Sequence, residues 1–316
     1  MSNKSNDLGR AYEFSYLMLL HQEISKIRSV EIEKNSGYIA AKSAWSKLSH
    51  IEKMTYEKSS LAGIKAIFEL EPMILEISNN DDPVILKIQQ DNKGAEGDVR
   101  DILIIRNSVQ WEIGLSIKHN NFAVKHSRLS KTIDFGDKWY GVPCSQKYWD
   151  NIKPIFDYLD VENAKKTKWR DLSDKEDKVY VPLLCAFLTE INEQKMINEN
   201  ILSRSMVEYL LGKFDFYKAI GSDKDETTII QCYNLRGTLS KKSSIVVPIS
   251  NLPTRILYAN FVHDSKNTLE ICFNNGWHFT FRIHNASTIV EPSLKFDIKI
   301  IGMPTTILSI TCRWNQ

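Results

Sequence analysis

The sequence lacks the features that mark several large classes of protein. Its five cysteines are so spread that successive ones lie at least 40 residues apart, which argues against a zinc knuckle, a redox motif or a disulfide framework. The N-terminus has no apolar segment of signal-peptide length, and the longest uncharged run, residues 300–312, is too short to span a membrane. We therefore expect a cytoplasmic protein without a membrane partner.

An excess of charge of one sign is also missing. Lys and Arg number 41 and Asp and Glu 39, so the formal net charge of the 316 residues is only +2. This balance excludes a histone-like polycation but allows a locally basic cleft. The chain also has no internal repeat or low-complexity tract, and 42% of its residues are hydrophobic. A globular protein with a normal core, and with room for two domains, is expected.

The order of the predicted elements favours a mixed α/β or α+β fold. Apolar residues recur every three or four positions over residues 8–27, which is typical of a half-buried helix. A second helical stretch is predicted over 38–73, with a break at Ser60 and Gly63. Residues 84–88 predict a strand, residues 120–129 could start a helix, and residues 138–220 are expected to be mostly helical.

The last third of the chain is rich in short strands separated by Asn, Gly and Pro turn signals. The predicted strands are residues 228–233, 245–249, 255–262, 268–273, 277–284 and 294–301. We therefore divide the chain into residues 1–220, a helical region with a catalytic core, and residues 221–316, a β-rich region expected to recognise the ligand.

A predicted β-hairpin over residues 101–118 carries the most informative charges. Two β-rich segments flank a short Asn-Ser turn. A four-residue connection would pair Asp101 with Ser116, and a two-residue turn would pair it with Gly114. Side chains alternate between faces along a strand, so both registers put Asp101 on the face that carries Ser116 and Lys118. The hairpin thus predicts a carboxylate and an ammonium on one face.

Two explanations account for such a pair, because burying either charge alone is costly. One is a structural salt bridge. The other is a hydrolytic site, in which the carboxylate holds a divalent cation and the lysine polarises water or stabilises charge on a phosphate.

The same residues resemble a known family. Asp101 at the start of one strand and Ser116-Ile-Lys118 on the next are similar to the PD-(D/E)xK nuclease core. Residues 97–101 and 111–120 resemble HaeIII-type type II restriction endonucleases more specifically, and residues 124–129, 281–287 and 295–297 extend the likeness. The resemblance implies a restriction-endonuclease-like core, a central mixed sheet flanked by helices, with a β-rich C-terminal region. It also implies Mg²⁺-dependent cleavage of both DNA strands at GGCC with blunt ends.

Ser116 departs from the family pattern, because it stands where that pattern has an acidic residue. Glu112 lies on the correct face but about 20 Å along the strand from Lys118, so we expect it to be structural or to pair with Arg106. Asp98 is ranked first as the second metal ligand. The other candidates are Asp134, on the helix after the motif, and Glu96, Glu57, Glu69 and Glu71.

The predicted catalytic residues are therefore Asp101, Lys118, Ser116 and His119, with Asp101, Asp98 and Asp134 as metal ligands. Mg²⁺ is the expected metal because it prefers carboxylate and water oxygens. His119 could contact phosphate or shuttle a proton, although a hydrogen-bonded histidine at a strand end explains it equally well.

Candidate DNA contacts lie after the hairpin and near the C-terminus. At helical spacing Lys125 and Arg128 would share a face, as would Arg128 and Lys131, and such a row suits phosphate contact or a solvated surface. Guanine is commonly bound by Arg and cytosine by Asp, which suggests Arg282 and Arg255 for guanine and Asp297 for cytosine. The full set of predicted DNA-binding residues is Lys125, His126, Arg128, Lys131, Arg255, Arg282, His284, Asn285 and Lys295, with Lys299 nearby. Trp139-Tyr140 and Tyr148-Trp149 are expected in the core.

Three functions follow from these patterns. The first is a restriction endonuclease acting on double-stranded DNA, with a cognate DNA methyltransferase as its functional partner. The second is a repair nuclease that recognises DNA structure on the same core. The third is a non-catalytic DNA-binding protein whose hairpin charges form only a salt bridge. A twofold-symmetric target would suit a homodimer.

Overall fold

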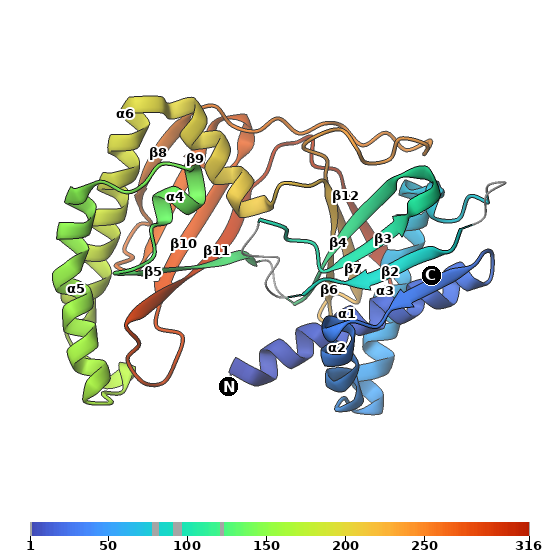
Figure 1. The fold of residues 1–316 in the computed structure, drawn as a ribbon, viewed down its shortest axis with the longest axis horizontal. Coiled ribbons are helices and arrows are strands. Elements are labelled where there is room, and N and C mark those ends of the chain that lie inside the picture. Colours follow the sequence, from blue (N-terminus) through green and yellow to red (C-terminus); the bar gives the residue numbers. More distant parts are fainter. Residues whose placement is uncertain (1, 78–81, 91–96, 121–122, 316) are drawn as a thin grey trace. The chain divides into compact units, whose positions relative to one another are not determined.

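The computed structural model describes residues 2–77, 82–90, 97–120 and 123–315. It confirms the predicted mixed α/β class, with helices, a mixed sheet and a second, antiparallel sheet. The chain forms two compact units (Figure 1). Unit 1 comprises residues 1–122, 212–250 and 305–316, and unit 2 comprises 123–211 and 251–304. Among the described residues no helix is both long and apolar enough to cross a membrane.

Unit 1 is built on a seven-stranded mixed sheet. Its strand order is β1-β2-β3-β4-β6-β7-β12. The pairings β1–β2 and β4–β6 are parallel and the others are antiparallel. The strands are β1 (Val30–Glu33), β2 (Val84–Ile88), β3 (Ile102–Arg106), β4 (Trp111–His119), β6 (Phe216–Ser222), β7 (Thr227–Tyr233) and β12 (Ser309–Arg313).

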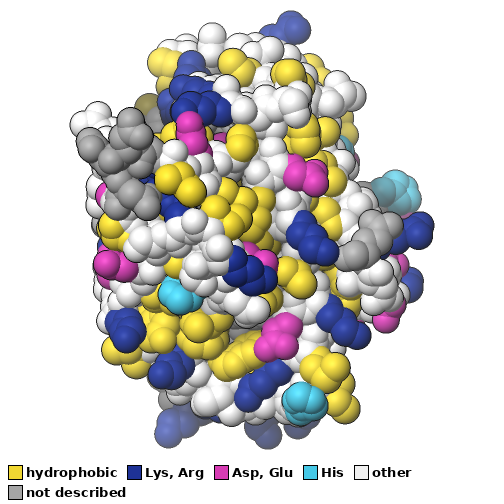
Figure 2. Space-filling model, turned by 90° about the vertical axis from the view of Figure 1, so that its right-hand side faces the viewer, with side chains coloured by type: hydrophobic (Ala, Val, Ile, Leu, Met, Phe, Trp, Pro, Cys, Tyr) yellow, Lys and Arg dark blue, Asp and Glu magenta, His cyan; other side chains and the backbone are white. Residues whose placement is uncertain are grey.

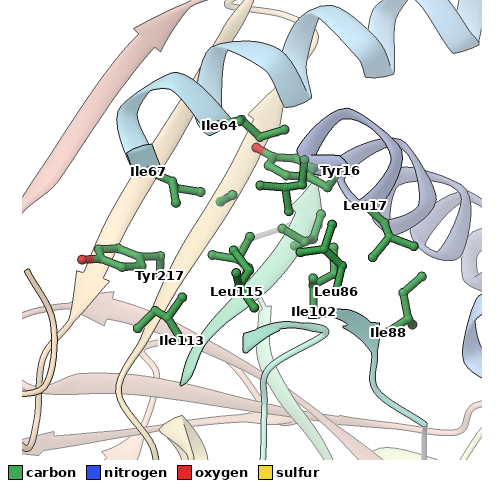
Figure 3. Close-up of a cluster of buried hydrophobic side chains, with 14 of the residues drawn as sticks. Tyr16, Leu17, Ile64, Ile67, Leu86, Ile88, Ile102, Ile113, Leu115 and Tyr217 are labelled. Carbon is green, nitrogen blue, oxygen red and sulfur yellow. The ribbon is translucent and has the colours of Figure 1, made fainter. Parts of the chain in front are cut away.

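Helices α1 (Ser2–Ser25), α2 (Ser36–Ser46) and α3 (His50–Leu70) belong to the same unit. Figure 3 shows Tyr16 and Leu17 of α1, with Ile64 of α3, above side chains of the strands. Alternate residues of β4, such as Ile113 and Leu115, are fully or almost fully buried in this cluster. The period of two along the strand therefore leaves the opposite face of β4 for Ser116 and Lys118.

The break in the second helical stretch lies at residues 47–49, and the prediction of a break at Ser60 and Gly63 was wrong. Ser49 begins α3 with a capping box, in which its side chain accepts from the Glu52 N–H and the Glu52 carboxylate accepts from the Ser49 N–H. Gly63 lies inside α3, and a Cβ there would come within 2.3 Å of the Tyr16 hydroxyl oxygen. It is a site of close helix packing rather than a helix end.

Unit 2 contains a five-stranded antiparallel sheet with the order β5-β11-β10-β9-β8. Its strands are β5 (Ala123–Ser130), β8 (Ile256–Phe261), β9 (Thr268–Phe273), β10 (His278–His284) and β11 (Ser293–Gly302), and its helices are α4 (Phe135–Tyr140), α5 (Gln146–Ala164) and α6 (Val181–Leu211). Trp139 of α4 stacks on Phe281 of β10, and Phe187 of α6 packs against Phe296 of β11. The helices thus cover one face of the sheet. The predicted burial of Trp139, Tyr140 and Tyr148 is confirmed, whereas Trp149 is only partly buried.

Several local predictions were wrong for a shared reason. Residues 123–130 form a strand instead of a helix because they pair with β11 from far along the chain. Residues 216–220, expected to be helical, lie in β6 and pair in parallel with β4.

The expected strand at 245–249 is irregular, whereas β1 and β12 were not predicted. A single boundary was predicted at residue 220, whereas both compact units are discontinuous in sequence.

Candidate active site and charged sheet face

The predicted hairpin is present, with the register of a four-residue connection. Ile102 pairs with Leu115 and Arg106 with Trp111, and residues 107–110 form the turn. The Asp101 N–H donates to the Leu115 carbonyl at 2.7 Å, which extends this register by one position. Asp101 therefore lies opposite Ser116, as expected.

Asp101 and Lys118 are in contact. The Lys118 ammonium donates to Asp101 Oδ2 at 2.9 Å. The same oxygen accepts from the Ile117 N–H at 2.6 Å and from the Ser116 hydroxyl at 3.3 Å. The pair is partly exposed, with 22% of the Asp101 side chain and 27% of the Lys118 side chain accessible. Three donors thus fix one carboxylate oxygen at a site that a ligand can reach.

Electrostatics favour the charged form of Lys118. Burial acts to lower the pKa of the ammonium, but the Asp101 carboxylate outweighs it, and Glu13 on α1 adds to the rise, so the pKa of Lys118 lies above its usual value. The lysine is a permanent cation at neutral pH and can stabilise negative charge without releasing a proton.

His119 lies on the other face of β4. Its Nε2 is 2.8 Å from Asp223 Oδ1, and its ring packs against Tyr12 and Tyr56. Adjacent strand residues point to opposite faces, so His119 is separated from the Asp101–Lys118 pair by the sheet itself. These contacts match the structural explanation given for His119 better than proton transfer.

Asp98 is the ion-pair partner of Arg100. Its two oxygens accept from Arg100 Nε and Nη2, each at 2.8 Å, and Gln89 donates to Oδ2 at 2.7 Å. Burial opposes ionisation, but these bonds hold the pKa of the Asp98 carboxyl below its usual value. The carboxylate that was ranked first as the second metal ligand is therefore occupied by a guanidinium.

Glu112 is structural, as expected, but its partner is Arg100 and not Arg106. Arg100 Nη1 donates to Glu112 Oε1 at 2.6 Å. Glu112 pairs with Ile105, so Arg106 projects from the opposite face of the hairpin, where its Nη1 donates to the Met73 carbonyl. The predicted Arg106 pairing was wrong because the register separates the two side chains by the thickness of the sheet.

The remaining acidic candidates have other contacts or positions. Asp134 belongs to unit 2 and caps α4, accepting from the N–H groups of Asp137 and Cys144. Glu71 is buried and accepts from the Tyr217 hydroxyl and the Ser240 N–H. Glu57 and Glu69 lie on α3, and Glu96 lies outside the described residues. Within the described ranges, no three His, Cys, Asp or Glu side chains gather to hold a metal ion.

Lys218 is a residue that sequence reasoning missed. It lies on β6 directly beside Ser116, and it is only 3% exposed. Burial and the neighbouring charge of Lys118 together lower the pKa of Lys218 to about 8, although Asp101 partly offsets both. The single lysine in the apolar run Phe216–Ile220 could have indicated a functional residue. It was not recognised because that segment was predicted to be helical.

Five of the predicted DNA-binding residues share one face of the unit 2 sheet, opposite the face covered by the helices. Arg282 pairs with Asp297, and His284 with Lys295. On the other side of β11, His126 pairs with Asp297 and Arg128 with Lys295. We call this set, with Thr280 and Lys299, the charged face: His126, Arg128, Thr280, Arg282, His284, Lys295, Asp297 and Lys299.

Positive charge is concentrated on the charged face. Burial and the nearby Lys295 ammonium lower the pKa of His126, and burial with Arg128 lowers the pKa of Lys295. Crowded cations of this kind suit an anionic ligand. On the side shown in Figure 2, by contrast, the described basic side chains are dispersed among acidic and apolar ones.

The other predicted DNA-binding residues lie elsewhere in unit 2. Lys125 is on the helix-covered face. Its ammonium donates to the Tyr209 carbonyl and lies 3.7 Å from the centre of the Tyr209 ring. It therefore does not share a face with Arg128, and the helical spacing argument was wrong. Lys131 pairs with Asp160, Asn285 is buried in the turn after β10, and Arg255 is exposed just before β8.

Comparison with known proteins agrees with this arrangement along the whole chain. The family model described as HaeIII restriction endonuclease matches residues 9–304. The chain is also 53% identical, over 321 aligned positions covering 100% of both proteins, to the type II restriction enzyme HaeIII of Haemophilus aegyptius. The chain belongs to the HaeIII restriction endonuclease family.

This membership confirms the resemblance inferred from the hairpin, and the activity is that of a type II restriction endonuclease, a site-specific deoxyribonuclease. It also excludes a non-catalytic DNA-binding protein as the main function of the chain. No solved structure matches the chain. The residue roles in this HaeIII family member therefore follow from its own geometry.

Proposed function

We propose that this restriction endonuclease hydrolyses both strands of duplex DNA at GGCC, leaving blunt ends, with Asp101 and Lys118 at the reacting phosphate. The observation that carries the proposal is the 2.9 Å contact between these two side chains at a partly exposed hairpin end. The GGCC target is taken from the resemblance to HaeIII-type enzymes, because neither composition nor spacing indicates it.

The residues around Asp101 fit a magnesium ion. Mg²⁺ commonly binds through one or two carboxylates and otherwise keeps water and substrate phosphate oxygens. In the described part of the chain, the three hydrogen bonds to the Asp101 side chain are all accepted by Oδ2. Oδ1 would therefore coordinate the ion. When bound, magnesium supplies a Lewis acid that polarises a phosphate oxygen.

The chain's own groups do the positioning. The Ile117 N–H and the Ser116 hydroxyl orient the Asp101 carboxylate, so Ser116 acts as a hydrogen-bond donor where the family pattern has an acid. The Lys118 ammonium is held in place by Asp101 and can stabilise the negative charge that develops on the phosphate. Because both charges are fixed before DNA binds, little reorganisation is needed during the reaction.

The charged face of unit 2 is the proposed DNA-recognition surface. It presents Arg, Lys and His side chains on adjacent strands, and β-strands are among the elements that read DNA grooves. A palindromic target has twofold symmetry, so we propose a homodimer that supplies one active site to each strand. A cognate methyltransferase that modifies the target cytosines would protect the host DNA.

Cleavage of unmethylated plasmid with Mg²⁺ tests the proposal. We expect wild-type protein to yield discrete blunt fragments that end within GGCC. We expect Lys118→Ala and Asp101→Asn each to reduce cleavage by at least about 10²-fold, while both still bind a GGCC duplex in Ca²⁺. Lys87→Ala is the matched control, because Lys87 forms an exposed ion pair with Glu33 in β1 and should leave cleavage unchanged.

Other results would overturn parts of the proposal. Cutting at wild-type rate by either variant would remove Asp101 and Lys118 from the site, and loss of folding together with cleavage would favour a structural salt bridge. Nicking at branched or mismatched DNA without a common sequence would indicate the structure-specific nuclease. Equal cutting of plasmids with methylated and unmethylated target cytosines would argue against protection by a methyltransferase.

A further inference from the structure

An acidic residue lies at the centre of the charged face. Asp297, in the middle of β11, has Arg282 as its register partner on β10 and His126 as its partner on β5. Its carboxylate oxygens lie 3.3 Å from Arg282 Nη2 and 3.8 Å from His126 Nδ1. On its own strand, Lys295 and Lys299 point to the same face.

An acid at this position requires an explanation if the charged face binds DNA. Phosphates repel a carboxylate, so Asp297 weakens the electrostatic part of binding that depends only on charge. Asp297 must then contribute either by orienting the Arg282 and His126 side chains or by contacting a base. The Arg282 side chain is 55% exposed, the Asp297 side chain is 16% exposed, and the bond between them is a single one at 3.3 Å. A single long bond to an exposed arginine contributes little to stability, which weakens the purely structural explanation.

The two side chains together match the hydrogen-bonding edge of one base pair. In the major groove a G·C pair presents two acceptors, guanine N7 and O6, beside one donor, the cytosine amino group. Arg282 offers donors in a fork that suits the guanine acceptors, and Asp297 offers only acceptors, which suit the cytosine amino group. Neighbouring strand partners hold the donor and the acceptor side by side.

We infer that Arg282 and Asp297 form a unit that reads one G·C pair in each half of the DNA target. This inference rests on the proposed function and deepens it by naming residues that determine specificity. It requires the intramolecular Arg282–Asp297 bond to open or bend when the base pair docks, which its length and exposure allow.

The test compares sequence preference before and after removal of the carboxylate. Wild-type, Asp297→Asn and Asp157→Asn proteins digest a library of duplexes with a randomised central segment, in Mg²⁺, and the cleaved ends are sequenced. Asp157 is the matched control because it is an acid of the same unit, ion-paired with Lys153 on the surface of α5. Binding of a GGCC duplex and of a random duplex is measured in Ca²⁺.

We expect Asp297→Asn to lose its preference for G·C at one position of each half-site and to keep the others. Specific binding should fall by about 10- to 100-fold, as expected for one base contact, while binding of the random duplex should be unchanged or tighter. Asp157→Asn should behave as wild type. Arg282→Gln should relax the same position, and it provides the test if Asp297→Asn does not fold.

Unchanged sequence preference in both Asp297→Asn and Arg282→Gln would overturn the inference. Equal loss of specific and random binding in Asp297→Asn would also overturn it, because that result indicates a structural role. The failure of the proposed function gives a different result, since wild-type protein itself would then cut the library without sequence preference.

Discussion

At the scale of single residues, the site contains two lysines and one described aspartate in contact or close electrostatic interaction. Lys118 is paired with Asp101. Lys218 is buried on β6 beside Ser116, the residue that stands where the family pattern has an acid. A buried ammonium is costly to keep. Lys218 lies beside Ser116 and interacts electrostatically with Lys118 and Asp101, so we propose that it also stabilises negative charge on the reacting phosphate.

Lys218→Met, which keeps most of the side-chain volume, tests this attribution. We expect cleavage of a GGCC plasmid to fall by about 10²-fold, because a fixed positive charge near the phosphate is lost, while the duplex still binds in Ca²⁺. Lys242→Met, which removes a lysine paired with Glu76 on the surface, is the control. Wild-type cleavage by Lys218→Met would assign the lysine to structure alone.

Asp98 permits a prediction about stability at different pH values. Its folded-state pKa is lowered, so its contribution is complete above the unfolded pKa of about 3.9 and is lost as pH falls through the folded pKa. Asp98→Asn should lower the free energy of unfolding by about 3 kcal/mol at pH 7, because Arg100 loses a buried partner.

Urea unfolding at pH 7 and pH 3 measures this effect. The difference between wild type and Asp98→Asn should shrink at pH 3, which is below the unfolded pKa, because the unfolded chain then binds a proton that the folded carboxyl resists. A difference of the same size at both values would show that the ion pair with Arg100 does not determine the stability contribution of Asp98.

At the scale of elements, the hairpin was predictable and its neighbours were not. Its two strands are neighbours in sequence, so nearby residues predict their pairing, and both registers that the sequence left open put Asp101 and Lys118 on one face. The structure has the register of the four-residue connection. β5 and β6 acquire their structure from β11 and β4, which are far away in sequence. The charged residues of the C-terminal strands could be named in advance, but their common face depended on these distant pairings.

Helix packing gives a prediction at the same scale. Gly63→Ala should lower the free energy of unfolding by about 1–3 kcal/mol, because the added Cβ would lie 2.3 Å from the Tyr16 hydroxyl oxygen and force α1 and α3 apart. Gly9→Ala in α1 is the matched control. Its Cβ would meet nothing within 4 Å, so it should be neutral or stabilising by up to about 1 kcal/mol.

Thermal or urea unfolding of the two variants provides the measurement. If Gly63→Ala were as stable as Gly9→Ala, the close approach of the two helices would not be a real constraint. The glycine would then have no packing explanation, because helix propensity alone favours alanine at this position.

At the scale of the whole molecule, the proposed chemistry and the proposed recognition belong to different compact units. Asp101, Lys118 and Lys218 lie in unit 1, and the charged face lies in unit 2. The sequence contains the residues of both sites but not the division between them. A boundary drawn by composition is a single cut, whereas unit 1 is assembled from three segments of the chain.

The chain passes from one unit to the other four times, after residues 122, 211, 250 and 304. Replacing the C-terminal part of the chain in order to change specificity would therefore also remove segments of unit 1. A chimera would have to replace two inserts, 123–211 and 251–304, and rejoin the host polypeptide at each junction. If the charged face reads the target as proposed, point changes on its strands alter specificity without new junctions between the units.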